Sequence, residues 1–149
     1  MNESKKVKNQ KKFSAPEDKS EARFQRDLKT ACLPLTFISE TDADVIPFTA
    51  GKPTTHSLDS YLTALDVNST EIEERTFDNF FDRLTSEKDW HGPKENERRK
   101  RWSNLRVVLE KGLDDLRVIR VGRVRLDIYV VGVDAGGKLA GVKTKAIET

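Results

Sequence analysis

The chain has 149 residues, of which 36% are hydrophobic and 35% charged, and its mean hydropathy is −0.66. A chain of this length commonly forms one domain, and no apolar run reaches the roughly 20 residues that span a bilayer. The formal net charge is +2, and the single cysteine excludes an intrachain disulfide. These features exclude a membrane protein and a disulfide-stabilised fold, and they indicate one soluble domain.

The first 19 residues hold most of the positive charge. They carry six lysines against three acidic residues, so the rest of the chain is close to −1. Few large apolar residues are present to offset the entropy of ordering this segment. We expect a disordered basic tail over residues 1–19 and a folded domain over residues 20–149. No apolar stretch of a signal peptide follows the basic start, which predicts a cytoplasmic protein without membrane partners.

The first predicted helix begins at a Ser20 cap and ends at Pro34. Its apolar residues share one face at helical spacing: Phe24, Leu28, Ala31, Cys32 and Leu35. On this face Cys32 is expected to be a buried, inert thiol. An apolar run over residues 35–38 then leads into an acidic segment at 39–44, and residues 45–48 could begin a strand.

Three more helices are predicted by apolar spacing. Ser57 and Thr76 each precede an apolar stripe and should cap two short helices. The longest helix should run from about Lys94 to Leu113 with a buried face that consists of Trp102, Leu105, Val108, Leu109 and Leu113.

The pattern then changes to a period of two, which is typical of strands. Residues 116–121, 124–130 and 139–147 predict a three-stranded antiparallel meander, with Gly136 and Gly137 in a hairpin turn. Helices followed by consecutive strands indicate an α+β domain. Apolar residues on both faces of some strands predict that helices cover the sheet on both sides.

Catalytic patterns are missing from the sequence. The two histidines, His56 and His91, do not have the spacing of zinc ligands. Ser57 follows His56 directly, and adjacent residues on a helix do not face each other. The glycine-rich segment 136–141 joins two strands, so no helix N-terminus is available to bind phosphate. We therefore expect a protein that is not an enzyme and has no cofactor of its own.

Two charged clusters leave alternatives open. Glu40, Asp42 and Asp44 could serve acid/base chemistry, as in a metal-free hydrolase, or hold a cation, or they could form a solvated acidic loop. The basic run over residues 98–101 precedes Trp102, and together with the tail it suggests an alternative function as a nucleic-acid-binding module. Trp102 also shares the spacing of the buried stripe, which favours a core position and makes nucleic acid the less favoured partner.

Two further features indicate a protein partner. Trp90 lies with Asp89 and His91 in a loop between helices, and an exposed tryptophan among polar groups is typical of a binding hot spot. The period-two pattern continues almost to Thr149, so we expect the sheet to hold the last residue. A chain end held in this way can present its oxygens to a partner.

Four segments resemble the nuclease A inhibitor family over roughly residues 20–149. These are residues 37–40 (FISE), 88–90 (KDW), 121–132 (VGRVRLDIYVVG) and 139–149 (LAGVKTKAIET). The strand L-D-x-Y-V-x-G and the ending L-A-G-x-x-T-K-x-x-E-T are the most specific parts of the resemblance.

The resemblance implies a three-layer α/β/α sandwich similar to plant pathogenesis-related class 1 proteins. It also implies a monomeric, antitoxin-like inhibitor that forms a 1:1 complex with a DNA/RNA non-specific endonuclease of the ββα-metal type. Thr149 would reach the catalytic magnesium of that nuclease, which is the only metal contact implied. Glu40 would pair with a phosphate-binding arginine of the enzyme. The other implied partner contacts are Lys88, Asp89, Trp90 and Glu148, and Lys88 departs from an uncharged polar residue in the family pattern.

Overall fold

The computed structural model describes residues 15–86 and 92–149, and side chains from residue 21 onward within these ranges. Four helices and seven strands are present in this part of the chain. The helices are α1 (Ala15–Ala31), α2 (Leu58–Ala64), α3 (Phe77–Thr85) and α4 (Pro93–Gly112). The strands are β1 (Thr36–Ile38), β2 (Asp42–Asp44), β3 (Ile46–Thr49), β4 (Ile72–Arg75), β5 (Asp114–Gly122), β6 (Arg125–Val133) and β7 (Leu139–Ile147).

The predicted meander forms the centre of an antiparallel five-stranded sheet with the order β3-β7-β6-β5-β4. Strand β3 extends the sheet on one side, with Ile46 opposite Lys143. Strand β4 extends it on the other, with Arg75 opposite Val118. The sequence pattern did not predict β4, because Ile72 is its only apolar residue. Charged side chains on an edge strand are common, since they discourage pairing with other chains.

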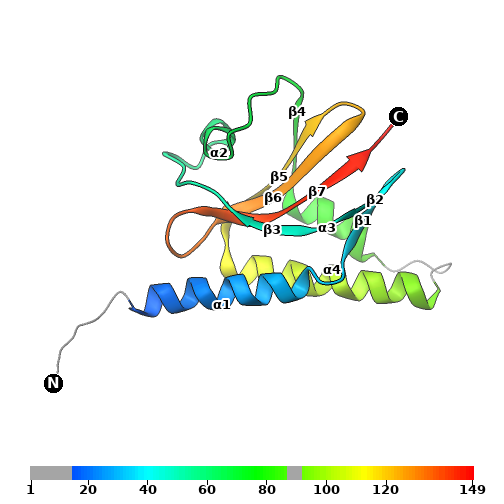
Figure 1. Ribbon diagram of the computed structural model, residues 1–149, viewed down its shortest axis with the longest axis horizontal. Coiled ribbons are helices and arrows are strands. Elements are labelled where there is room, and N and C mark those ends of the chain that lie inside the picture. The colour runs from blue at the N-terminus through cyan, green and yellow to red at the C-terminus, as the bar shows by residue number, and fades with distance from the viewer. Residues whose placement is uncertain (1–14, 87–91) are drawn as a thin grey trace.

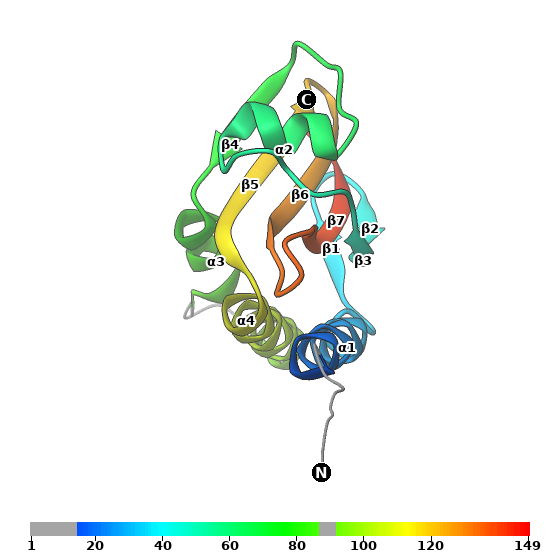
Figure 2. The ribbon, with the colours of Figure 1, turned by 90° about the vertical axis from the view of Figure 1, so that its left-hand side faces the viewer.

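Helices cover both faces of the sheet, as the sequence predicted. Figure 2 shows α1, α3 and α4 on one side of the strands and α2 on the other. Val118 and Val130 contribute to the cluster beneath α1, α3 and α4, whereas the adjacent Ile119 and Val131 contribute to the cluster beneath α2. Neighbouring strand residues point to opposite faces, so both must be covered when both are apolar. The predicted α+β class is therefore confirmed, while the likeness to pathogenesis-related class 1 proteins stays a prediction.

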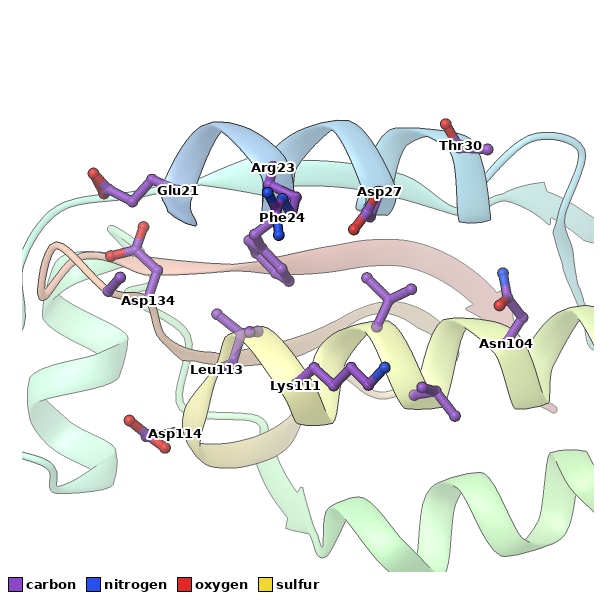
Figure 3. A pocket seen from close by; sticks show the side chains of 14 residues that line it. Glu21, Arg23, Phe24, Asp27, Thr30, Asn104, Lys111, Leu113, Asp114 and Asp134 are labelled. Carbon is purple, nitrogen blue, oxygen red and sulfur yellow. The ribbon is translucent and has the colours of Figure 1, made fainter. Parts of the chain in front are cut away.

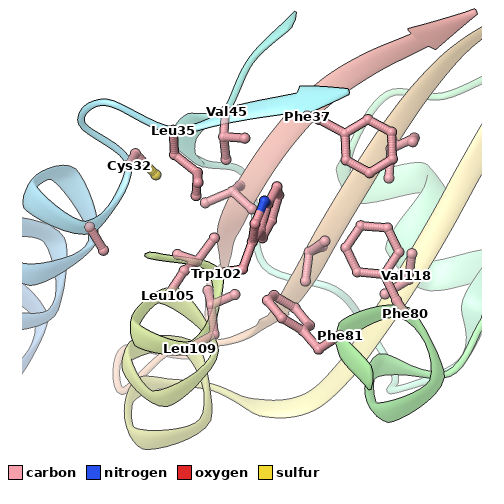
Figure 4. Packing of buried hydrophobic residues seen from close by; sticks show 14 of the residues in the cluster. Cys32, Leu35, Phe37, Val45, Phe80, Phe81, Trp102, Leu105, Leu109 and Val118 are labelled. Atoms are coloured by element: carbon pink, nitrogen blue, oxygen red, sulfur yellow. The ribbon is translucent and has the colours of Figure 1, made fainter. Parts of the chain in front are cut away.

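The larger core cluster is centred on Trp102 of α4, which is 2% exposed (Figure 4). Its ring meets Phe81 of α3 at 5.9 Å and Phe37 of β1 at 6.2 Å, both with edge-to-face geometry. Such aromatic pairs stabilise a core beyond the area that they bury. This cluster fixes α3, α4 and the β1–β2 hairpin to one another.

The predicted caps of the two short helices are confirmed. Ser57 Oγ accepts a hydrogen bond from Ser60 N at 3.2 Å, and Thr76 Oγ1 accepts one from Asn79 N at 3.1 Å. The longest helix begins and ends within one residue of the predicted positions. None of the helices within residues 15–86 and 92–149 is long and apolar enough to cross a bilayer.

The predicted Ser20 cap is wrong, because α1 begins at Ala15. Pro16 lies in the first turn, where the missing N–H would have no intrahelical partner. Residues 1–14 lie outside the described residues, so the basic tail stays a prediction.

Candidate partner-binding site at the chain end

Glu40 and Thr149 meet at the surface although they are 109 residues apart in sequence. Thr149 donates two hydrogen bonds to Glu40 Oε2, one from its backbone N at 2.8 Å and one from its Oγ1 at 2.7 Å. Figure 1 shows the end of β7, in red, beside the β1–β2 hairpin that carries Glu40. Both hydrogen bonds favour the ionised carboxylate, and they hold the pKa of Glu40 below its usual value.

The turn between β1 and β2 also holds the backbone at the end of β7. Ile147 N donates to Ser39 Oγ at 3.0 Å, and Glu40 N donates to Ile147 O at 3.3 Å. Ser39 is itself fixed, because its hydroxyl donates to Thr41 O at 3.1 Å. The acidic segment, for which a solvated loop was one of the alternatives, is partly ordered as strand β2, with Asp42 opposite Ile38. The expectation that the sheet holds the last residue is only partly met, because β7 ends at Ile147 and Thr149 is held by the Glu40 side chain.

A buried arginine holds the penultimate residue. Arg120 of β5, whose side chain is 9% exposed, donates from Nη2 to Glu148 Oε1 at 2.5 Å and from Nε to Glu73 Oε1 at 3.0 Å. The backbone N of Glu148 donates to Val124 O at 2.9 Å. A guanidinium removed from water needs such partners to offset its desolvation. The carboxylate of Glu148 therefore has an internal partner, and its predicted contact with another protein stays a prediction.

A groove of about 560 Å³ opens beside the chain end. Its lining includes Glu40, Glu148 and Thr149 together with three arginines. The lining residues come from β1, the β1–β2 turn, β4, α3, β5 and the chain end: Phe37, Ile38, Ser39, Glu40, Arg75, Phe80, Arg83, Leu84, Arg120, Ile147, Glu148 and Thr149. The sequence predicted three members of this site, Glu40, Glu148 and Thr149, and the structure brings them together.

The arginines of this groove were not predicted. Arg120 had a detectable signal, because it interrupts the apolar run of residues 118–121. Arg75 and Arg83 had none, since charged residues at the end of an edge strand and on an exposed helix face are ordinary. Lys88, Asp89 and Trp90 lie outside the described residues, so their predicted contacts stay predictions.

Other candidate sites give little support for catalysis or nucleic-acid binding. No group of three or more His, Cys, Asp or Glu residues that could hold a metal ion occurs in the described part of the chain. Asp42 and Asp44 are exposed on β2, which supports the solvated alternative for the acidic cluster. Trp102 is buried and cannot stack on bases beside the basic run. Cys32 is 2% exposed, and burial raises its thiol pKa to about 12, as expected of an inert thiol.

A second hollow of about 800 Å³ lies between α1 and α4, away from the chain end (Figure 3). Its walls mix acidic residues such as Glu21 and Asp134 with the basic residues Arg23 and Lys111. It contains none of the residues that the sequence predicted for a site.

The fold and the site together define a small α+β protein whose last residues are held at the surface by its own polar side chains. The family model described as "nuclease A inhibitor-like protein" matches residues 22–149, so the chain belongs to the nuclease A inhibitor-like family. The resemblance found in the sequence is thereby confirmed. Membership implies a role as a nuclease inhibitor with a nuclease as partner, and it suggests a protein that is not itself an enzyme. A comparison with curated proteins found no match.

Proposed function

We propose that this protein inhibits a sugar-non-specific endonuclease of the ββα-metal type by inserting Thr149 into the active site. The pair of hydrogen bonds between Thr149 and Glu40 is the observation that carries the proposal. These bonds hold an exposed chain end in one position, at the rim of a groove and clear of the core. The inhibitor acts as a monomer in a 1:1 complex, and Lys88, Asp89 and Trp90 contact the rim of the active site.

The hydrogen bonds leave Thr149 suited to binding a metal ion. A hydroxyl has one proton to donate and two lone pairs. Because the proton of Oγ1 is directed at Glu40, the lone pairs of Oγ1 are free to face the partner. Oxygen is the ligand type that Mg²⁺ prefers. An inhibitor oxygen on the catalytic magnesium occupies the position that water or a substrate phosphate needs for turnover.

Glu40 serves both the chain end and the partner in this proposal. Both hydrogen bonds from Thr149 reach Oε2, and within the described residues no hydrogen bond to Oε1 is present. Oε1 is therefore free to accept a hydrogen bond from a phosphate-binding arginine of the nuclease. A charge-assisted bond of this kind is stronger than a neutral one. Glu40 thus takes the place of the substrate's negative charge while it orients Thr149.

The contacts that hold Ile147, Glu148 and Thr149 preorganise the chain end for binding. A flexible chain end would lose conformational freedom on entering the active site, and that loss weakens binding. Here Ser39, Glu40 and Arg120 have already ordered the end of β7. More of the interaction with the nuclease then contributes to affinity.

To test the proposal, wild-type protein and the Thr149→Val variant are each titrated into a ββα-metal nuclease encoded in the same genome, and the remaining nuclease activity is measured. Valine keeps the shape of the side chain and the backbone N–H but removes the hydroxyl. Thr49→Val on β3 is the matched control, because Thr49 is an exposed strand threonine outside the groove. We expect stoichiometric inhibition by wild type and by the Thr49 variant, and weaker inhibition by the Thr149 variant. Equal inhibition by all three proteins would contradict the proposal.

A further inference from the structure

The groove beside Thr149 contains arginine side chains that its carboxylates do not fully pair. Arg120 is already paired with two carboxylates, since Glu73 and Glu148 each accept a hydrogen bond from it. Among the described residues, Arg75 has polar contacts with Glu73 alone, at 3.4 to 3.5 Å, and that carboxylate already accepts the shorter bond from Arg120. Arg83 on α3 is exposed and has no ion pair with any residue that the structure describes. The guanidinium of Arg83 therefore remains available to a ligand, and that of Arg75 is held only by long hydrogen bonds to Glu73.

These two groups lie on the surface that a bound nuclease must cover. Arg75, Arg83 and Thr149 line the same groove. A partner that brings its metal ion to Thr149 also shields this groove from water. Covering a guanidinium without giving it an acceptor is costly, because the charge loses its hydration and gains nothing in return. A partner that supplies an acceptor here therefore binds more tightly than one that does not.

A carboxylate fits the proposed binding mode as the acceptor better than a phosphate does. The proposed binding mode excludes nucleic acid from the metal site, since Thr149 occupies the position of the substrate. What remains opposite the groove is the protein surface of the nuclease, whose anionic side chains are Asp and Glu. Arginine binds carboxylates through two parallel hydrogen bonds, and the apolar groove residues Phe80 and Leu84 exclude water beside such a pair.

We propose that Arg75 and Arg83 bind an acidic side chain of the target nuclease beside its metal site and so select which nuclease is inhibited. This inference rests on the proposed function and deepens it. It predicts that the inhibited enzyme has an Asp or Glu at the rim of an otherwise cation-lined active site. A nuclease with a basic residue at that position would be repelled by Arg83.

The test compares the variants Arg83→Gln and Arg83→Glu with the same substitutions at Arg26. For each protein the inhibition constant against the nuclease is measured at low and at high salt. Arg26 is a matched control because it is an exposed helical arginine outside the groove. We expect Arg83→Gln to raise the inhibition constant roughly threefold to tenfold, with a further loss for Arg83→Glu that salt reduces. Both Arg26 variants should stay within roughly twofold of wild type.

A charge reversal on the nuclease identifies the partner residue. Each Asp and Glu at the rim of its metal site is changed to Lys in turn and titrated with the Arg83→Glu protein. One reversal should restore tight inhibition by Arg83→Glu while weakening inhibition by wild type. The proposal is overturned if Arg83→Glu behaves like Arg26→Glu, or if no reversal restores inhibition.

Three further outcomes separate the alternatives. If the protein without nuclease binds a fluorescent single-stranded oligonucleotide and Arg83→Glu abolishes that binding, the groove is a phosphate site and the proposal is wrong. If wild type forms no complex with the nuclease, the proposed function fails and this inference fails with it. If wild type inhibits and the Arg83 and Arg26 variants are equal, only this inference fails. Arg83 is exposed, so unfolding of its variants is not expected, and their urea unfolding curves verify this.

Discussion

Trp102 and Thr149 belong to two regions of the molecule that are held in place by different interactions. Trp102 is 2% exposed, and aromatic and aliphatic side chains from three helices and the sheet surround it. Thr149 is exposed, and two hydrogen bonds to Glu40 hold it. Burial of apolar area dominates stability, whereas exposed polar contacts contribute little to it. The comparison indicates that the aromatic core determines whether the chain folds and the chain end determines what it binds.

The largest expected effect is on stability. Trp102→Ala removes a buried ring from the contact between α3, α4 and β1, and the resulting cavity should cost about 3–5 kcal/mol. This is a large part of the roughly 5–15 kcal/mol that stabilises a domain. Urea unfolding followed by circular dichroism measures the loss. A variant as stable as wild type would show that the aromatic cluster does not dominate the core.

The next effect is on inhibition alone. Deleting Thr149 should raise the inhibition constant roughly 30-fold or more, as expected for a hot-spot residue. The midpoint of urea unfolding should not change, because an exposed terminal residue buries little apolar area. Enzyme titration and urea unfolding of the same preparation check both parts. A deletion that unfolds the protein would show that the chain end is also needed for folding.

Deleting Glu148 together with Thr149 tests how far the chain end contributes to stability. The longer deletion also removes the carboxylate of Glu148 from Arg120 and leaves Glu73 as its carboxylate partner among the described residues. Glu148 is about half exposed, so the loss of the ion pair should lower the free energy of unfolding by about 1 kcal/mol. Urea unfolding of the two deletion variants side by side measures the difference. Identical stability would mean that Arg120 does not need Glu148.

The contribution of Glu40 to inhibition should be smaller and should depend on pH. Glu40 has a depressed pKa, so its interactions with Thr149 are present above the ordinary carboxyl pKa and are lost as the pH falls through the lowered value. Glu40→Gln should weaken inhibition roughly threefold to tenfold near neutral pH. The difference from wild type should shrink in acid, and taking the ratio of the two inhibition constants cancels titrations of the nuclease itself.

The control for this variant is Glu71→Gln. Glu71 is an exposed carboxylate paired with the exposed Arg123, and it lies outside the groove. The Glu71→Gln protein should have the same inhibition constant as wild type at every pH. A Glu40→Gln/wild-type ratio that does not change with pH would show that the charge of Glu40 has no part in inhibition.

The smallest effect concerns Cys32 in the core. Its pKa of about 12 leaves almost no thiolate near neutral pH, and its side chain is buried. A thiol reagent should therefore modify the native protein only as fast as it unfolds, and Trp102→Ala should accelerate the modification. Deleting Thr149 should not change the rate. Rapid modification of native wild type would show that the core is open near α1.

The same two regions show what a sequence can predict. The helices, two of the caps and the central strands follow local periodicity, and residues such as Thr76 and Val130 lie as expected. Strand β4 was missed because its backbone pairing with β5, and not apolar alternation, makes it a strand. The sequence predicted that the sheet holds the chain end, and it predicted Glu40 as a contact for a partner. It could not show that Glu40 binds Thr149, because no local pattern relates two residues so far apart.

The central claim is that Thr149 lies at the metal ion of the nuclease. The most direct measurement is the nuclear magnetic resonance spectrum of ¹⁵N-labelled protein in complex with the nuclease, loaded first with Mg²⁺ and then with paramagnetic Mn²⁺. Mn²⁺ should broaden the amide signals of Thr149 and Glu40 the most, while signals from α1, such as that of Leu28, stay sharp. A Thr149 signal that survives while another surface of the protein is broadened would contradict the account.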